Sequence, residues 1–251
     1  MSAPLIELRK LGKSLPNGTA ILEDINLQVA KGETFGLVGL SGSGKSTIGR
    51  IIMGLSHQTT GEVLLNGEPL DLGSAASRPR RAAMQMVFQN PLGAFNPRRQ
   101  IGESLELPMI NFGIGSLSER RERIGELLTK VGLEPRFALR YPHELSGGQC
   151  QRAGIARALM TGPSFVFLDE PLSALDVSVQ AQVANLLKDL QQDLGLTYLF
   201  VANNLAMARF MSDRVAILEK GRVVESGPVD AIFDNPVENF TRKLLAASLT
   251  I

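Results

Sequence analysis

The feature that most constrains this chain is a glycine-rich segment between an apolar strand and a helix. Residues 34–38 predict a short buried strand, and residues 45–53 predict a helix. They are joined by a run that continues into the helix: Gly39, Leu40, Ser41, Gly42, Ser43, Gly44, Lys45, Ser46 and Thr47. Glycines leave backbone amides open to an anion, and the helix N-terminus attracts it. The run therefore predicts a phosphate-binding loop, in which Lys45 adds charge to the phosphates and the Ser46 hydroxyl ligates Mg²⁺.

The periodicity of apolar residues divides the rest of the chain. Its first third predicts strands separated by Gly and Asn turns, at 21–29, 34–38, 62–65 and 84–88. Helical spacing then takes over from 102 to 160, clearest at 118–131 and 148–159. After Pro163 the predicted elements are strands at 165–168 and 197–202, a helix at 177–190, a hairpin of 215–218 with 222–225, and two amphipathic helices. The small, basic segment 74–81 is expected to be a surface loop.

This order of elements predicts an α/β fold of the P-loop NTPase class, with a mixed or parallel sheet, an N-terminal antiparallel β part and an inserted α-helical subdomain. We expect one nucleotide-binding domain over 1–251. Its β core would comprise 1–89 and 164–251, and its helical subdomain 90–163.

A second chemical element follows the strand at 165–168. Asp169 and Glu170 come directly after four apolar residues, so both carboxylates should emerge at the C-terminal edge of a buried strand, where α/β sheets bind ligands. Asp169 is expected to hold Mg²⁺ through water. Glu170 is then expected to act as the general base on an attacking water.

A third element precedes the helix at 148–159. Leu145 is followed by a hydroxyl side chain, two glycines and an amide side chain, which again offer a hydroxyl and free amides to an anion: Ser146, Gly147, Gly148 and Gln149. One nucleotide does not need two such devices. Two chains arranged head to tail would use both anion-binding segments, because the third element of each chain would cover the nucleotide bound by the other chain.

With this third motif, the sequence resembles the ABC transporter ATPase family over nearly its whole length. The resemblance implies a RecA-like core, ATP and Mg²⁺ as cofactors, and a homo- or heterodimer bound to an integral membrane permease. It also implies that Gln89 is the glutamine that touches Mg²⁺ and the attacking water. Residues 173–176, ending in Asp176, would link the two sites of the dimer.

Narrower motifs resemble the importer ATPases for oligopeptides, dipeptides and nickel. They lie at 87–98, at 140–144 and at Asn235–Pro236 with Phe240–Thr241. The implied function is the ATP-hydrolysing subunit of such an importer, peripheral to the cytoplasmic face of a bacterial-type inner or plasma membrane and served indirectly by a substrate-binding protein. Two alternatives stay open: a soluble ABC ATPase outside transport, or a slow nucleotide-binding partner in a heterodimeric motor.

Two residues depart from the family's pattern. Asn203 follows the strand at 197–202 where the family has a histidine that contacts the γ-phosphate, and Leu15 stands where the family stacks an aromatic side chain on adenine. Losing one donor aimed at the transition state costs about 10²- to 10³-fold in rate. Stacking on a base is worth about 1–3 kcal/mol. Asn203 leaves two hypotheses open: a slow site that pairs with a different ATPase subunit retaining the histidine, or a homodimer in which Glu170 suffices for an ordinary rate. Leu15 predicts weaker affinity for ATP and poorer discrimination against GTP.

Composition sets limits on partners. The 26 Lys and Arg residues nearly balance the 25 Asp and Glu residues, and the net charge of +1 gives no reason to expect nucleic acid as a partner. No apolar stretch reaches the roughly 20 residues that a membrane-spanning helix needs. The single cysteine, Cys150, lies at a predicted helix start, where a thiol is either unusually acidic or simply packed.

Overall fold

The computed structural model describes residues 4–73 and 77–248. The chain divides into two compact units: unit 1 comprises Met1–Gly73 and Thr197–Ile251, and unit 2 comprises Ser74–Leu196. The subdomain boundaries predicted after residues 89 and 163 remain a prediction.

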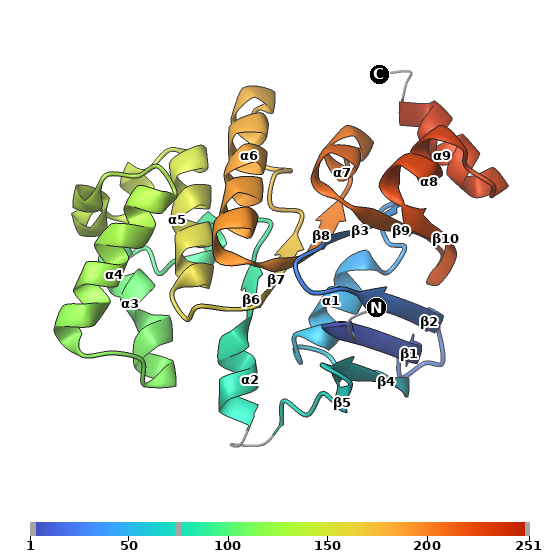
Figure 1. The fold of residues 1–251 in the computed structure, drawn as a ribbon, viewed down its shortest axis with the longest axis horizontal. Coiled ribbons are helices and arrows are strands. Elements are labelled where there is room, and N and C mark those ends of the chain that lie inside the picture. The colour runs from blue at the N-terminus through green and yellow to red at the C-terminus, as the bar shows by residue number, and fades with distance from the viewer. Residues whose placement is uncertain (1–3, 74–76, 249–251) are drawn as a thin grey trace. The chain divides into compact units, whose positions relative to one another are not determined.

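Unit 1 begins with an antiparallel sheet of order β2-β1-β4-β5. Its strands are β1 (Ile6–Ser14), β2 (Ala20–Val29), β4 (Thr60–Leu65) and β5 (Glu68–Pro69), which form one layer in Figure 1. Alternation of buried and exposed residues along β2 places one face against the core. The predicted antiparallel β part is confirmed. No element was predicted over β1, because bulges interrupt its alternation.

The second strand group of unit 1 runs in the order β10-β9-β3-β8. It consists of β3 (Thr34–Gly39), β8 (Thr197–Ala202), β9 (Arg214–Glu219) and β10 (Arg222–Pro228). β3 pairs in parallel with β8 and β9, whereas β9 and β10 form the predicted hairpin. Every residue of β3 and β8 is buried, as expected of parallel strands covered on both faces.

The described residues of unit 1 also form the helices α1 (Lys45–Ile52), α7 (Leu205–Met211), α8 (Val229–Asp234) and α9 (Asn239–Ser248). α1 contacts β3 and β8 through a face that includes Ile48 and Ile52, both nearly fully buried. The phosphate loop therefore leads from a buried strand into a packed helix, as the sequence predicted.

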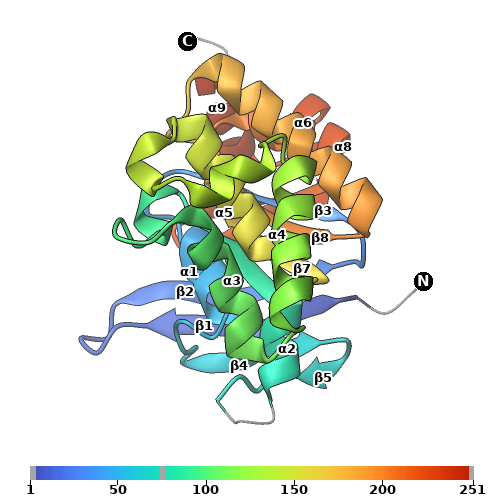
Figure 2. The same ribbon diagram turned by 90° about the vertical axis from the view of Figure 1, so that its left-hand side faces the viewer.

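Unit 2 holds the parallel pair β6 (Met84–Val87) and β7 (Phe165–Asp169). Its longer helices are α3 (Ile101–Phe112), α4 (Leu117–Lys130), α5 (Gly147–Leu159) and α6 (Val177–Leu194). Short 3-10 turns occur at Leu92–Ala94, Pro135–Leu139 and Pro142–Glu144. Figure 2 shows α3 and α4 side by side, and both contact α5, so the predicted helical segment is a packed cluster.

The loop predicted at 74–81 is wrong where the structure describes it. Residues 74–76 lie outside the described residues, but Arg78–Ala83 form helix α2. Pro79 lies in the first turn of this helix, where proline is tolerated because its missing N–H has no partner there. The Arg and Ala residues that follow are good helix formers, and this propensity outweighed the loop-like appearance of the segment.

Candidate functional site

The phosphate loop of unit 1 has a backbone that only glycine accepts at its turns. Gly39, Gly42 and Gly44 have φ values of 155°, 79° and 105°. A Cβ atom on Gly39 would also lie well inside 3.0 Å of the Leu218 carbonyl oxygen, and one on Gly44 would collide with Leu22. Conformation therefore favours glycine at all three positions, and contact with the backbone of Leu218 excludes a side chain at Gly39 as well.

The Lys45 side chain is hydrogen-bonded to the backbone of this loop. The residue is 4% exposed, and its Nζ donates to the carbonyl oxygens of Gly39 (2.8 Å) and Leu40 (2.9 Å). The N-cap of α1 is Gly44, which has no side chain with which to cap the helix. The amides of the first turn and a held ammonium group thus belong to one short segment, which is the arrangement that binds phosphate at a helix start.

Asn203 emerges beside the phosphate loop in unit 1. β3 and β8 are parallel with Val38 opposite Ala202, so Gly39 and Asn203 follow at the same edge of the sheet. The Asn203 side chain is exposed there. The next residue, Asn204, has a separate task that sequence reasoning missed: its Oδ1 accepts from the Met207 N–H (3.2 Å) and caps α7.

Leu15 lies in the turn between β1 and β2. Its N–H donates to the Thr19 carbonyl oxygen (2.9 Å), and the residue is 42% exposed. An exposed leucine at this turn is compatible with contact to a ligand, and its predicted role toward adenine remains a prediction.

In unit 2, two strand ends bring predicted site residues together. β6 and β7 are parallel with Val87 opposite Leu168, so Gln89 and Glu170 emerge at one edge. The Gln89 Nε2 donates to the Glu170 Oε2 at 2.9 Å. Asp169, the last residue of β7, is only 6% exposed. The register thus places the predicted general base in direct contact with the predicted glutamine.

Glu170 has an uncommon backbone conformation. Its φ of 49° lies in the left-handed region, which costs a non-glycine residue about 1–3 kcal/mol and is concentrated at functional sites. Ser173 supports this turn, because its N–H and its Oγ donate to the Glu170 carbonyl oxygen (3.2 and 3.1 Å). The same Oγ accepts from the Gln89 Nε2 (3.3 Å). Sequence reasoning assigned Ser173 no individual role, because the contact depends on the backbone turn.

The glycine-serine motif forms the start of α5. Ser146 is the N-cap: its Oγ accepts from the Gln149 N–H (3.3 Å), and the Gln149 Oε1 accepts from the Ser146 N–H (3.0 Å). This reciprocal pair is a capping box. A Cβ atom on Gly148 would lie 2.7 Å from Val179, so this glycine is also required where α5 meets α6. Asp176 is the N-cap residue of α6.

Cys150 is packed and not activated. Its side chain is buried in α5, and this burial raises the pKa of the thiol to about 11, since the thiolate loses solvation. Of the two possibilities raised by the sequence, the acidic thiol is therefore wrong, because desolvation outweighs the helix N-terminus.

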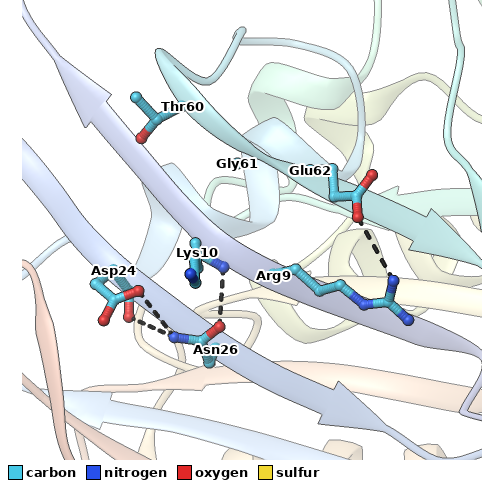
Figure 3. Close-up of a pocket in the computed structure, with 7 residues that line it drawn as sticks. All are labelled: Arg9, Lys10, Asp24, Asn26, Thr60, Gly61 and Glu62. Carbon is cyan, nitrogen blue, oxygen red and sulfur yellow. Dashed lines mark hydrogen bonds and ion pairs between the residues drawn. The ribbon is translucent and has the colours of Figure 1, made fainter.

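Unit 1 also has a surface hollow of about 860 Å³, shown in Figure 3. It is lined by Arg9, Lys10, Asp24, Asn26, Thr60, Gly61 and Glu62. Its polar groups largely bind one another: Arg9 pairs with Glu62 (3.5 Å), and the Asn26 amide bonds to Asp24 and to the Lys10 N–H. The predicted site residues, all within the described ranges, are not among its lining.

The described residues offer no cluster of three or more His, Cys, Asp or Glu side chains for a metal ion. Magnesium does not need one, since it is usually bound by one or two protein oxygens together with substrate phosphates. Across the described residues, no helix combines the length and apolar character that crossing a membrane requires.

Comparison with known proteins agrees with this arrangement. The ABC transporter family profile matches residues 22–173. The chain is 46% identical over 258 residues to the oligopeptide transport ATP-binding protein OppF of Bacillus subtilis (strain 168), covering 98% of this chain and 83% of that protein. It is 44% identical over 255 residues to AmiF, the oligopeptide transport ATP-binding protein of Streptococcus pneumoniae serotype 4, covering 98% and 82%.

Two solved structures share the fold. The cbiO1 protein of Clostridium perfringens, part of the ABC transporter complex cbiONQ, superimposes with a TM-score of 0.85 at 26% identity, covering 93% of this chain and 92% of that one. The ATP-binding cassette MJ0796, solved as a dimer bound to ADP and Pi, gives 0.79 at 35% identity, covering 89% and 98%.

A phosphate loop on a parallel strand, with carboxylates at a second parallel strand end, defines a P-loop ATPase fold. The chain belongs to the ABC transporter family. The family and the fold class predicted from the sequence are thereby confirmed.

Proposed function

We propose that this chain is the ATP-binding and ATP-hydrolysing subunit of a peptide importer, peripheral to the cytoplasmic face of the membrane. The observation that carries the proposal is the phosphate loop, with Lys45 held by two loop carbonyls at the start of α1. Identity of 44–46% to oligopeptide transport ATP-binding proteins over 98% of the chain supports peptides as the cargo class. Nickel, the related cargo of the predicted subfamily, is the less supported choice.

In this proposal unit 1 binds the nucleotide. The loop amides and Lys45 hold the triphosphate, because they combine several N–H donors with a positive charge. Leu15 contacts the base without the stacking energy of an aromatic side chain. Asn203 offers an amide N–H toward the phosphate side of the sheet edge, but it cannot become charged as a histidine can.

Unit 2 supplies the chemistry. Glu170 accepts the proton of the attacking water, which is the role of a positioned carboxylate in general base catalysis. Gln89 fixes the Glu170 carboxylate through its Nε2, and Ser173 holds the backbone turn beneath it. Because Gln89 uses its Nε2 for these bonds, its Oε1 is the atom that can act as an acceptor toward water or a cation.

The donor set also suits magnesium. Ser46, Asp169 and Gln89 provide a hydroxyl, a carboxylate and an amide oxygen, which are the hard oxygen ligands that this cation takes. When bound, magnesium neutralises charge that develops on the phosphates.

The proposed assembly is a dimer with a permease. Ser146–Gln149 would contact the nucleotide held by the other subunit, with Asp176 near the junction of the two sites. MJ0796, which is similar in fold, has been solved as a dimer bound to ADP and Pi. A permease and a substrate-binding protein would complete the importer.

The test is ATP hydrolysis by the full chain, alone and reconstituted in vesicles with its permease and substrate-binding protein. We expect magnesium-dependent release of phosphate that a bound peptide stimulates. Glu170→Gln should slow release by about 10²- to 10⁴-fold, while Glu122→Gln, at an exposed position in the same unit, should leave it unchanged. Phosphate release that continues unchanged in Glu170→Gln would refute the proposed general base. Stimulation by nickel and not by peptides would refute the cargo class.

A second candidate function is favoured by Asn203. If this chain turns over slowly by itself, it would serve as the weaker partner in a heterodimer whose other subunit retains the histidine. Restored turnover on mixing with such a subunit supports the heterodimer, and ordinary turnover by the isolated chain opposes it.

A further inference from the structure

We infer that the tip of the β9–β10 hairpin, Lys220–Gly221, positions the phosphate loop, and that Gly221 is the residue that does so. The inference rests on the proposed nucleotide binding at the loop. It concerns unit 1 alone, since the hairpin, the loop and β2 all belong to that unit.

The hairpin tip is bonded on two sides. The Gly221 N–H donates to the Ser43 carbonyl oxygen (3.1 Å), inside the phosphate loop. The Gly221 carbonyl oxygen accepts from the Glu23 N–H (2.8 Å) in β2. The two bonds fix the tip between the phosphate loop and the first sheet of unit 1, and β10 contacts β2 directly.

The loop is held at its other end by the same hairpin. Leu218 in β9 lies opposite Gly39, so close that a Cβ atom on Gly39 would collide with the Leu218 carbonyl oxygen. One hairpin therefore braces both the first residue of the loop and Ser43, just before α1 begins. A displacement of the hairpin must change the loop at both places.

The bond to Ser43 has a direct chemical consequence. In a trans peptide the C=O and the following N–H point in opposite directions. With the Ser43 carbonyl turned toward Gly221, the N–H of Gly44 is turned away from the hairpin. That N–H is one of the amides that the loop offers to a phosphate. Through its bond to the Ser43 carbonyl, Gly221 thus sets the direction in which the Gly44 N–H points.

Only glycine fits at 221. Its φ is 81°, and a Cβ atom would lie well inside 3.0 Å of the Ile21 carbonyl oxygen in β2. Because that neighbour is backbone, a side chain at 221 would push the tip away from β2. The N–H of residue 221 would then move relative to Ser43.

The β4–β5 hairpin provides a matched control within the same unit. Its tip, Asn66–Gly67, has φ values of 52° and 80°, and the Lys220–Gly221 tip has 44° and 81°. Both are two-residue turns with two positive φ values. A Cβ atom on Gly67, however, would meet nothing within 4 Å. Alanine imposes the same backbone strain at both positions but a collision only at 221.

The experiment compares Gly221→Ala with Gly67→Ala in the full chain. Titration calorimetry measures affinity for ATP, ADP and AMP in the presence of magnesium. We expect Gly221→Ala to weaken ATP and ADP binding about 10-fold or more, the loss of one hydrogen bond to a charged ligand. AMP binding should change less than about 2-fold, since AMP makes fewer phosphate contacts. Gly67→Ala should leave all three affinities within about 2-fold.

Equal ATP affinity in the two variants would overturn the inference. So would a uniform loss for ATP, ADP and AMP, which a merely structural defect produces. Gly221→Asn is a third variant, since asparagine tolerates positive φ but still carries a Cβ. Recovery of ATP affinity in Gly221→Asn would show that strain, and not contact with β2, caused the loss.

Amide hydrogen exchange on the unmodified chain tests the same contact if Gly221→Ala does not fold. We expect ATP to slow exchange at Gly221 and to leave Gly67 unchanged. Exchange at Gly221 that does not respond to ATP would overturn the inference. If the unmodified chain itself binds no ATP, the proposed function fails; if it binds ATP and the two alanine variants behave alike, only the inference fails.

Discussion

The candidate sites of the two units differ in the groups that form them, which are mainly backbone groups in unit 1 and mainly side chains in unit 2. In unit 1 the phosphate loop is mainly backbone: glycine amides, two carbonyls that hold Lys45, and a third carbonyl held by Gly221. In unit 2 the site is mainly side chains: Gln89 donates to the Glu170 carboxylate and to the Ser173 hydroxyl, and that hydroxyl donates to the Glu170 backbone carbonyl.

In the proposed function, this difference separates nucleotide binding in unit 1 from catalysis in unit 2. Backbone donors have positions set by the fold, so they can hold an anion but cannot accept a proton at neutral pH. A carboxylate can accept a proton, and its efficiency depends on the groups that orient it. Substitutions in unit 2 should therefore change turnover, and substitutions in unit 1 should change affinity, with Asn203 as the exception.

The largest expected effect lies in unit 2. Glu170→Gln should lower turnover by about 10²- to 10⁴-fold, because the amide cannot accept the proton of water. Affinity for ATP should stay within a few-fold of the unmodified chain, because the loop of unit 1 is untouched. Single-turnover phosphate release and equilibrium ATP binding measure the two quantities. A variant that loses affinity and keeps turnover would break the division between the units.

Asn203→His tests the one position in unit 1 at which a substitution is expected to change turnover and not affinity. An imidazole in place of the amide supplies a donor that can be charged, and we expect turnover to rise, by up to about 10²-fold. Steady-state hydrolysis at saturating ATP is the measurement. Asn239→His, at an exposed position in the same unit, is the control. Unchanged turnover would mean that Glu170 suffices and that the chain needs no more active partner.

Lys45→Ala should act on affinity. Removing the ammonium group costs about 1.5–3 kcal/mol, a 10- to 150-fold weaker binding of ATP, since hydrogen bonds to charged groups have this magnitude. The exposed Lys31→Ala serves as control in unit 1. The comparison is made by titration calorimetry. ATP binding equal in the two variants would remove the phosphate loop from the proposed function.

Leu15→Tyr should strengthen binding through the base. A tyrosine ring stacked on adenine adds about 1–3 kcal/mol, which corresponds to about 5- to 150-fold. The effect should be larger for ATP than for inorganic triphosphate, which has no base. Leu55→Tyr, at another exposed leucine of unit 1, is the control. If both tyrosine variants bind ATP as the unmodified chain does, Leu15 does not contact the base.

The smallest effect concerns the start of α5 in unit 2, at Cys150. Burial raises the pKa of this thiol from 9.0 to about 11. The unfolded chain therefore releases the proton first, so this contribution to the free energy of unfolding is complete below pH 9 and is lost as the pH rises toward 11. Urea unfolding at pH 8 and pH 10.5 measures the loss, which should be smaller in Cys150→Ala. Equal losses would place the thiol in solvent.

Much of the fold was predictable from local patterns. The strand at 197–202 was predicted with its observed ends, and the helix at 45–53 ended within one residue of α1, because apolar runs and glycine punctuation are strong local signals. The helix α2 was missed because its residues carry little hydrophobic periodicity. β1 was missed because its bulges disturb the alternation on which strand prediction depends.

The candidate site likewise has features that were predictable from the sequence and features that were not. Residue types and spacing were enough to predict the phosphate loop, the carboxylates at the end of β7 and the family, since those motifs depend on neighbours in sequence. The contacts of Ser173 with Glu170, and of Gly221 with Ser43, could not be predicted in this way. They join residues through a backbone turn or across 178 positions, and only the folded chain brings those atoms within hydrogen-bonding distance. The sequence by itself determined which chemical groups this protein carries; the tertiary structure decided which of them touch, because strand register and hairpin packing set those distances.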